Sequence, residues 1–255
     1  MNTGIEHKPT SHAALKNVVA MMGLVKKLQS RPPHLPNIGV MHGPSGYGKS
    51  WAAIYAENKT RAVRVEVCDS WTRKALLKAI LAEMGCAMPR GTISDMAERA
   101  VELLSDDVNR PLLIDEADKL VDKNMVELVR ELAEFSQVPV VLIGEEALPA
   151  KLARVERVHN RVLDWAPAQP CDLEDTKKLA ALYVGKVTLS DPLLERVRQQ
   201  SDGRARRIVT NLHHIAEYAR NHGVTAVDEG YTGRFYTGEV PPLRTSAFRP
   251  ARRAA

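Results

Sequence analysis

The sequence has few of the features that mark secreted or membrane-spanning proteins. Its 255 residues include three cysteines, which show neither the spacing of a metal site nor a pairing pattern: Cys68, Cys86 and Cys171. Isolated cysteines favour free thiols in a reducing compartment. No apolar run reaches the roughly 18 residues of a transmembrane helix. The first ten residues, MNTGIEHKPT, lack the apolar core of a signal peptide. We therefore expect a cytoplasmic protein without membrane contact.

Neither sign of charge dominates the chain. It carries 36 Lys and Arg against 31 Asp and Glu, a formal net charge of +5. That excess permits a polyanionic partner but does not require one. With 44% hydrophobic and 26% charged residues, the composition is ordinary for a globular protein with a substantial core.

One glycine-rich stretch carries a complete nucleotide-binding motif. Residues 43–50, GPSGYGKS, fit G-x-x-x-x-G-K-[ST] throughout. Glycines let the backbone curl so that several N–H groups face a phosphate, and the following helix presents its N-terminus to the same anion. Lys49 reaches the β- and γ-phosphates, and the Ser50 hydroxyl is a ligand for Mg²⁺. A predicted strand before the motif and a helix after it disfavour a glycine turn without a ligand. We predict binding of ATP and Mg²⁺ by Gly43, Pro44, Ser45, Gly46, Tyr47, Gly48, Lys49, Ser50 and Trp51.

A second motif, RPLLIDEADKL at residues 110–120, supplies two acids after an apolar strand. Residues 112–114 are typical of a central parallel strand. Asp115 at its end is predicted to hold Mg²⁺, and Glu116 to polarise the attacking water. Two acids at a helix N-terminus are also favoured by the helix dipole alone. The complete glycine-rich motif upstream favours the catalytic interpretation.

Predicted strands and helices alternate along the first two thirds of the chain. Strands are expected at 38–41, 62–69, 112–115 and 138–146, and helices at 11–29, 49–58, 70–86, 94–107 and 124–137. This alternation predicts an α/β fold with a parallel sheet flanked by helices, a P-loop NTPase core. After residues 167–170, PAQP, only helices are predicted, followed by a Pro- and Arg-rich tail expected to be flexible. The expected parts are an N-terminal helix and linker (1–37), an ATPase core (38–168), a small all-helical lid (169–227) and a flexible basic tail (228–255).

The order of these motifs resembles that of AAA+ ATPases over most of residues 11–225. The glycine-rich loop, LLIDEAD, ARVERVHNRV and SDGRARRI follow one another as in that family. The stretches IGVMHGPSGYGKSWAAIYAE and VPVVLIGEEALPAKLARVERVHNRV are most similar to the B proteins of Mu-type transposable phages, the ATPases that select target DNA. Those proteins usually carry an N-terminal helix-turn-helix module. Here the first predicted strand starts at residue 38, so we expect DNA contacts from the ATPase body or the tail instead.

The resemblance implies roles for several charged residues outside the two motifs. In AAA+ proteins an arginine of one subunit reaches the γ-phosphate held by the next. Arg161 is the first choice for this arginine finger and Arg157 the second, with Arg154 beside them; a solvated basic helix face is the alternative. Arg206 resembles the sensor-2 arginine of the lid, with Arg204 and Arg207 as competitors. Glu145 occupies the sensor-1 neighbourhood, where relatives carry a neutral polar residue, and a helix-capping role fits it equally well.

Relatives direct the helix after the second strand toward DNA. Here that helix carries Thr72, Arg73, Lys74 and Lys78, which are predicted to contact backbone phosphates without reading sequence. A solvated helix face is the alternative for these cations, and core packing is the alternative for Trp71. The tail segment RTSAFRPARR is a second basic candidate.

The resemblance as a whole implies a DNA-stimulated ATPase of DNA transposition. Such a protein assembles into a helical filament or ring on duplex target DNA, delivers that DNA to a transposase, and disassembles on hydrolysis, in the cytoplasm of a bacterial or phage-infected cell. A helicase loader or clamp-loader-like ATPase shares the same motifs. A regulatory scaffold that binds ATP without hydrolysing it is a third possibility, which the intact Glu116 disfavours.

Overall fold

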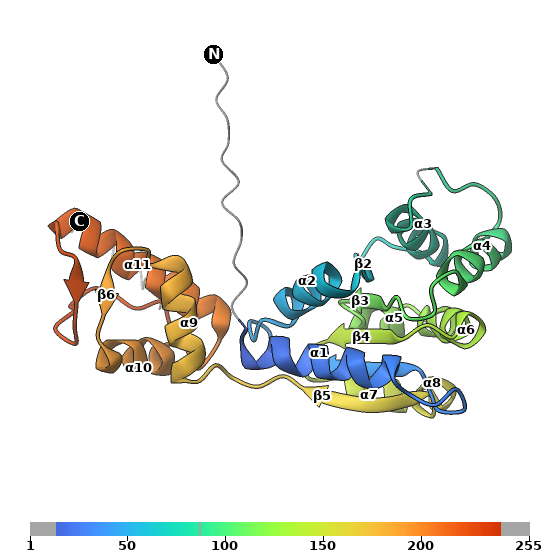
Figure 1. The fold of residues 1–255 in the computed structure, drawn as a ribbon, viewed down its shortest axis with the longest axis horizontal. Coiled ribbons are helices and arrows are strands. Elements are labelled where there is room, and N and C mark those ends of the chain that lie inside the picture. The colour runs from blue at the N-terminus through green and yellow to red at the C-terminus, as the bar shows by residue number, and fades with distance from the viewer. Residues whose placement is uncertain (1–13, 87, 241–255) are drawn as a thin grey trace, which may run out of the picture.

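A five-stranded parallel sheet forms the centre of the first part of the molecule (Figure 1). The computed structural model describes residues 14–86 and 88–240. The strand order is β2-β3-β4-β1-β5, with bounds β1 Ile38–His42, β2 Val63–Glu66, β3 Leu112–Asp115, β4 Val140–Gly144 and β5 Val162–Pro167. The predicted parallel α/β fold is therefore confirmed. No strand was predicted at 162–167, because its half-buried residues lack a regular apolar pattern.

Successive residues of the central strands point to opposite faces of the sheet, and each face is covered by helices. On β4, Val140 and Leu142 pack on one face, and Val141 and Ile143 pack on the other. Fully buried parallel strands read as continuous apolar runs for this reason. Helices α1 (Lys16–Gln29) and α2 (Lys49–Thr60) cover the second face. The first face is covered by α3 (Arg73–Glu83), α4 (Ile93–Ser105), α6 (Val126–Ser136), α7 (Leu148–Ala153) and α8 (Glu156–His159).

The predicted helices of the first part are present, and all are shorter than predicted except α2, which extends to Thr60. The predicted helix at 70–86 spans 73–83, because Thr72 accepts a hydrogen bond from Ala75 N and caps it. The short helix α5 (Asp118–Asp122), directly after β3, was not predicted. The residue at the N-cap of α1 is Leu15, which has no side-chain group to cap the helix.

The second part of the molecule packs three helices around their own core: α9 (Leu173–Tyr183), α10 (Asp191–Gln200) and α11 (Ala205–His222). The expectation that this part is all-helical is wrong in one respect. Strands β6 (Thr188–Leu189) and β7 (Ala226–Val227) form a two-stranded parallel ladder beside the helices. Strands of two residues carry too little periodicity to be predicted from sequence.

The start of the predicted tail is folded onto this helical part. Tyr231 is 5% exposed and belongs to its core. Arg196 holds the segment by donating to Tyr231 O and by covering the Phe235 ring at 4.9 Å. The prediction of a flexible tail is therefore wrong for residues 228–240. The basic segment RTSAFRPARR lies outside the described residues.

Asn17 joins the two parts of the molecule at the glycine-rich loop. It is 4% exposed, and its Nδ2 donates to Tyr47 O at 2.7 Å and to Gln169 O at 2.8 Å. Its Oδ1 accepts from Gln169 N at 2.8 Å. One buried amide thus ties α1, the loop and the linker between the two parts. Within the described ranges, no helix is long and apolar enough to cross a membrane.

The buried thiol of Cys171 provides a test of this packing. Burial raises its pKa to about 12, and the adjacent Asp175 and Asp172 carboxylates add to the shift. The reactive thiolate is therefore scarce at pH 8. We expect iodoacetamide to alkylate the exposed Cys68 in the native protein and to reach Cys171 only in denaturant, as measured by mass spectrometry of the peptides. Cys68→Ser serves as the control for signal assignment. Equal labelling of both thiols in the native protein would contradict the packing.

Candidate functional site

The glycine-rich loop follows β1 and wraps around the N-terminus of α2. Gly46 and Gly48 have φ angles of 87° and 84°, a left-handed region that residues with a Cβ seldom adopt. The Lys49 ammonium donates to two loop carbonyls, Gly43 O at 2.7 Å and Pro44 O at 3.0 Å. Ser50 and Trp51, in the first turn of α2, are exposed. The predicted nucleotide-binding residues thus form one continuous turn at the carboxyl end of β1.

Lys49 is the positive centre of this edge of the sheet. Burial lowers the pKa of its ammonium below the usual value. The carboxylates of Asp115, Glu145 and Glu116 oppose that shift, in this order of strength. Lys49 therefore shares one electrostatic environment with the acids that follow β3 and β4.

Asp115 ends β3 and is 3% exposed. Its Oδ1 accepts from Glu116 N at 2.9 Å, whereas its buried Oδ2 has no hydrogen-bond partner among the described residues. A buried carboxylate oxygen without a partner is costly unless a cation or water satisfies it. Such an oxygen is suited to the Mg²⁺ ligation that the sequence predicts for Asp115. In the sheet, β4 lies between β3 and β1, so Asp115 is two strands away from the strand that carries the loop.

Glu116 adopts a left-handed backbone conformation, with a φ of 57°. For a residue with a side chain this conformation costs about 1–2 kcal/mol. It is held in place because Glu116 N donates to the Asp115 carboxylate. The Glu116 side chain is 42% exposed, and its Oε2 lies 3.6 Å from the Lys119 ammonium. Backbone strain at such a position is typical of functional sites.

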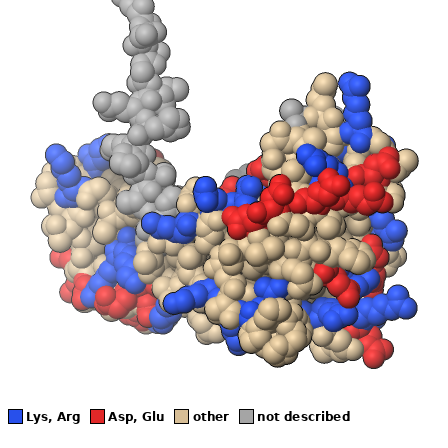
Figure 2. Space-filling view, turned by 45° about the vertical axis from the view of Figure 1, so that its right-hand side comes forward, with Lys and Arg blue, Asp and Glu red and all other residues tan. Residues whose placement is uncertain are grey.

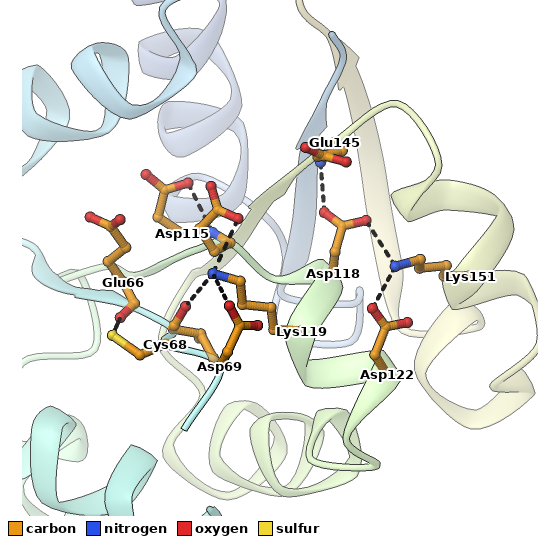
Figure 3. A network of polar contacts seen from close by, with 11 residues as sticks. Glu66, Cys68, Asp69, Asp115, Asp118, Lys119, Asp122, Glu145 and Lys151 are labelled. Carbon is orange, nitrogen blue, oxygen red and sulfur yellow. Dashed lines mark hydrogen bonds and ion pairs between the residues drawn. The ribbon is translucent and has the colours of Figure 1, made fainter. Parts of the chain in front are cut away.

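Glu145 follows β4, and its side chain is exposed. Its backbone N–H donates to Asp118 Oδ2 at 2.6 Å (Figure 3). Asp118 is 6% exposed, and its Oδ1 lies 3.7 Å from the Lys151 ammonium. A Cβ at Gly144 would lie 2.2 Å from Asp118 Oδ2, so only glycine fits there. Asp118 was missed in the sequence analysis, although its place in IDEAD, one helical turn after Asp115, was a signal.

Two of the three lid arginines touch the glycine-rich loop. Arg204 Nη1 donates to Ser45 O at 2.7 Å, and its guanidinium lies 5.8 Å from the centre of the Tyr47 ring. Arg206 N donates to Gly46 O at 3.2 Å, and its side chain is exposed beside the loop. Arg207 instead lies against Gly238 of the C-terminal segment. The structure therefore separates Arg207 from the loop and leaves Arg206 and Arg204 as candidates for nucleotide contact.

Arg161 lies at the amino end of the parallel strands, opposite the end that carries the glycine-rich loop. It directly precedes β5, whose first residue pairs with Ile38 at the start of β1. The length of β1, about 16 Å, separates that position from the loop of the same chain. Arg161 Nη2 pairs with Glu134 Oε1 at 3.0 Å. Arg157 in α8 and Arg154 are exposed, and no ion pair of either side chain is present in the described part of the chain. At this distance only another subunit could bring Arg161 to a nucleotide.

The candidate DNA-contacting residues lie at the start of α3. Thr72 caps the helix, Arg73 Nη2 donates to Asn124 O at 2.9 Å, and Lys74 and Lys78 are exposed. The Trp71 side chain is partly buried and packs against the core. Figure 2 shows a contiguous band of acidic side chains across the upper right of the molecule, with Lys and Arg side chains scattered around it and no broad basic surface on this face.

Comparison with known proteins places this arrangement in a fold class. Residues 34–152 match the family model described as an AAA domain. The ORC2 protein of Aeropyrum pernix, solved as ADPNP-ADP complexes, superposes with a TM-score of 0.63 at 14% identity, covering 83% of this chain and 64% of that one. The ORC1 protein of Aeropyrum pernix in complex with DNA gives a TM-score of 0.62 at 17% identity, covering 86% and 64%.

These likenesses show the fold, a parallel sheet flanked by helices. The chain spans about two thirds of the length of those solved chains. The two-component response regulator ORR7 of Oryza sativa subsp. japonica is 25% identical over 109 residues, which are 42% of this chain and 50% of that protein.

The contacts of Asp118 generate a stability prediction. We expect Asp118→Ala to lower the free energy of unfolding by about 2–3 kcal/mol, because it leaves the Glu145 N–H and one side of Lys151 without a charged partner. Asp122→Ala is the matched control: it removes the other carboxylate of Lys151, at 2.7 Å and 54% exposed, and should cost less than about 1 kcal/mol. Urea unfolding followed by circular dichroism measures both. Equal losses would show that the Asp118 contact contributes no more than a surface ion pair.

Proposed function

We propose that this AAA-domain protein is an ATPase that binds duplex DNA without sequence specificity and assembles on it as a ring or helical filament. It presents that target DNA to a transposase, and ATP hydrolysis drives disassembly. The observation that carries the ATPase assignment is the convergence of the glycine-rich loop, the unpaired Asp115 oxygen and Glu116 at one edge of the sheet. The transposase as partner rests on the sequence resemblance.

Each residue of the edge has a role in this proposal. The loop N–H groups and Lys49 bind the phosphates, and Ser50 and Asp115 hold Mg²⁺, which supplies positive charge to the transferring phosphoryl group. Glu116 orients and deprotonates the attacking water. Arg206 binds the nucleotide of its own subunit and thereby couples the position of the lid to the nucleotide state. Glu145 stands beside Lys49 as the residue nearest the sensor-1 position.

Subunit assembly completes the site. Arg161, or Arg157 as the second choice, lies at the far edge of the sheet and reaches the γ-phosphate of a neighbouring subunit. The γ-phosphate is then a charge-assisted contact at every interface. Its loss weakens each interface and couples hydrolysis to release from DNA.

A helicase loader or a clamp-loader-like ATPase would use the same site residues. A preference for single-stranded over duplex DNA would favour the loader, and a preference for duplex DNA would favour this proposal. The non-hydrolysing scaffold gains one supporting observation, because Glu116 is engaged by Lys119. Turnover measurements decide that alternative.

The first test separates nucleotide binding from hydrolysis. We expect Lys49→Ala to abolish binding of a fluorescent ATP analogue. Glu116→Gln should keep binding and lower turnover by roughly 10²–10⁴-fold, the usual contribution of a general base. Glu102→Gln, an exposed acid of α4, is the control and should leave both unchanged. Turnover of Glu116→Gln equal to that of the unaltered chain would remove Glu116 from the mechanism.

The second test is imaging of the protein on duplex DNA by negative-stain microscopy with a slowly hydrolysed ATP analogue. We expect nucleotide-dependent filaments that disappear when Arg73, Lys74 and Lys78 are all changed to Ala. The matched control changes three exposed lysines of α1 and α2 to Ala: Lys26, Lys27 and Lys59. Closed rings that ignore duplex DNA would favour the loader alternative. Loss of filaments in both triple variants would show an effect of net charge alone.

A further inference from the structure

Lys151 of α7 connects two short helices that follow neighbouring strands of the sheet. Figure 3 shows its ammonium between two carboxylates of α5. It donates to Asp122 Oδ2 at 2.7 Å and lies 3.7 Å from Asp118 Oδ1. The Asp118 carboxylate is buried, whereas the Asp122 side chain is 54% exposed. One cation therefore joins α7, which follows β4, to α5, which follows β3.

Asp118 also contacts the segment that leads into α7. Its Oδ2 accepts from Glu145 N at 2.6 Å, so residues 145–151 are attached to α5 at both ends. Asp118 Oδ1 has no hydrogen-bond partner among the described residues. A buried carboxylate oxygen in that state is costly without a nearby cation. The ion pair with Lys151 thus stabilises both the buried charge and the course of this segment.

The arginines considered for action on a neighbouring subunit follow Lys151 along the chain. Arg154 ends α7, Arg157 lies in α8, and Arg161 directly precedes β5. Helices α7 and α8 have six and four residues, which is too short for a helix to be stable alone. They bury three side chains: Leu148, Leu152 and Val158. The orientation of residues 154–161 therefore depends on contacts such as that of Lys151.

We propose that Lys151 is a positioning residue that holds residues 154–161 in the orientation that the nucleotide of the next subunit requires. This proposal rests on the proposed function, since it concerns the arginine that acts between subunits. Loss of the Lys151 contact loosens the segment that carries the arginines. The consequence falls on hydrolysis in the neighbouring subunit, because that is where Arg161 acts.

A mixing experiment separates the two sides of the subunit interface. Lys49→Ala subunits lack the phosphate-binding lysine but carry Arg161, so they serve as donors. Arg161→Ala subunits bind nucleotide but lack the finger, so they serve as recipients. We expect each variant alone to be nearly inactive in steady-state ATP hydrolysis with duplex DNA. An equal mixture should regain activity, because a donor supplies its arginine to a recipient.

Lys151→Met is then added to either the donor or the recipient. We expect the rate of the mixture to fall severalfold when the donor carries the change, and by less than about twofold when the recipient carries it. Lys151→Arg retains the charge and should preserve the rate in both placements. The control is Lys177→Met, which removes a lid lysine that also pairs with two carboxylates, Glu174 and Asp191, and should have no effect in either placement.

A purely structural role of Lys151 gives a different pattern. A less stable subunit would fail equally as donor and as recipient, so equal losses would overturn the proposal, as would an unchanged rate with the altered donor. Asp122→Asn replaces Lys151→Met if that variant does not fold. It removes the 2.7 Å partner at an exposed position, and its smaller loss should also be confined to the donor. Equal rates in the two placements would overturn the proposal.

Failure of the proposed function is distinguishable from failure of this inference. If donor and recipient without further changes regain no activity, the experiment is repeated with Arg157→Ala as the recipient. No recovery with either recipient, or no hydrolysis by the unaltered chain, would overturn the arginine contact between subunits and the role of Lys151 together. Recovery with equal losses in the two placements would overturn the role of Lys151 alone.

Discussion

Parallel pairing of β3, β4 and β1 is the constraint on which the site depends. In parallel strands the carboxyl ends meet at one edge. The register Ile38–Val140 and Leu112–Val140 aligns the three strands. Asp115, Glu145 and the glycine-rich loop therefore leave the sheet side by side, although they lie far apart in the sequence. Their shared influence on Lys49 is the electrostatic consequence of that alignment.

Several acidic side chains lie at the same edge, and they differ in how many partners the surrounding structure gives them. Asp118 Oδ2 accepts from the Glu145 backbone, and its Oδ1 faces the Lys151 ammonium at 3.7 Å without a hydrogen-bond partner among the described residues. Asp115 keeps one buried oxygen without a described partner. The Glu116 backbone is in a strained left-handed conformation, and its carboxylate pairs with the Lys119 ammonium. Unsatisfied or strained groups persist where the surrounding structure over-determines them, and here they coincide with the positions predicted for metal binding and hydrolysis.

The accuracy of the sequence interpretation follows the strength of each local pattern. Continuous apolar runs such as residues 140–143 predicted central strands because both faces of the sheet are covered. The strand at 162–167, with half-buried residues, had no such pattern. Residues 228–240 read as a tail because their contacts with α11 and Arg196 are made by isolated residues such as Tyr231 and Phe235. Local periodicity contains no signal for packing of that kind.

The sequence by itself determined the fold class, the loop residues 43–50 and the acids Asp115 and Glu116, because backbone curvature and strand burial restrict residue types locally. Only the tertiary structure decided which charged side chains meet. It brought Arg204 and Arg206 to the loop and Arg207 away from it. It placed Arg161 at the far edge of the sheet and joined Lys119 to both Glu116 and Asp69. Long charged side chains are compatible with many local conformations, and their partners are fixed by the distances that strand order and helix packing impose.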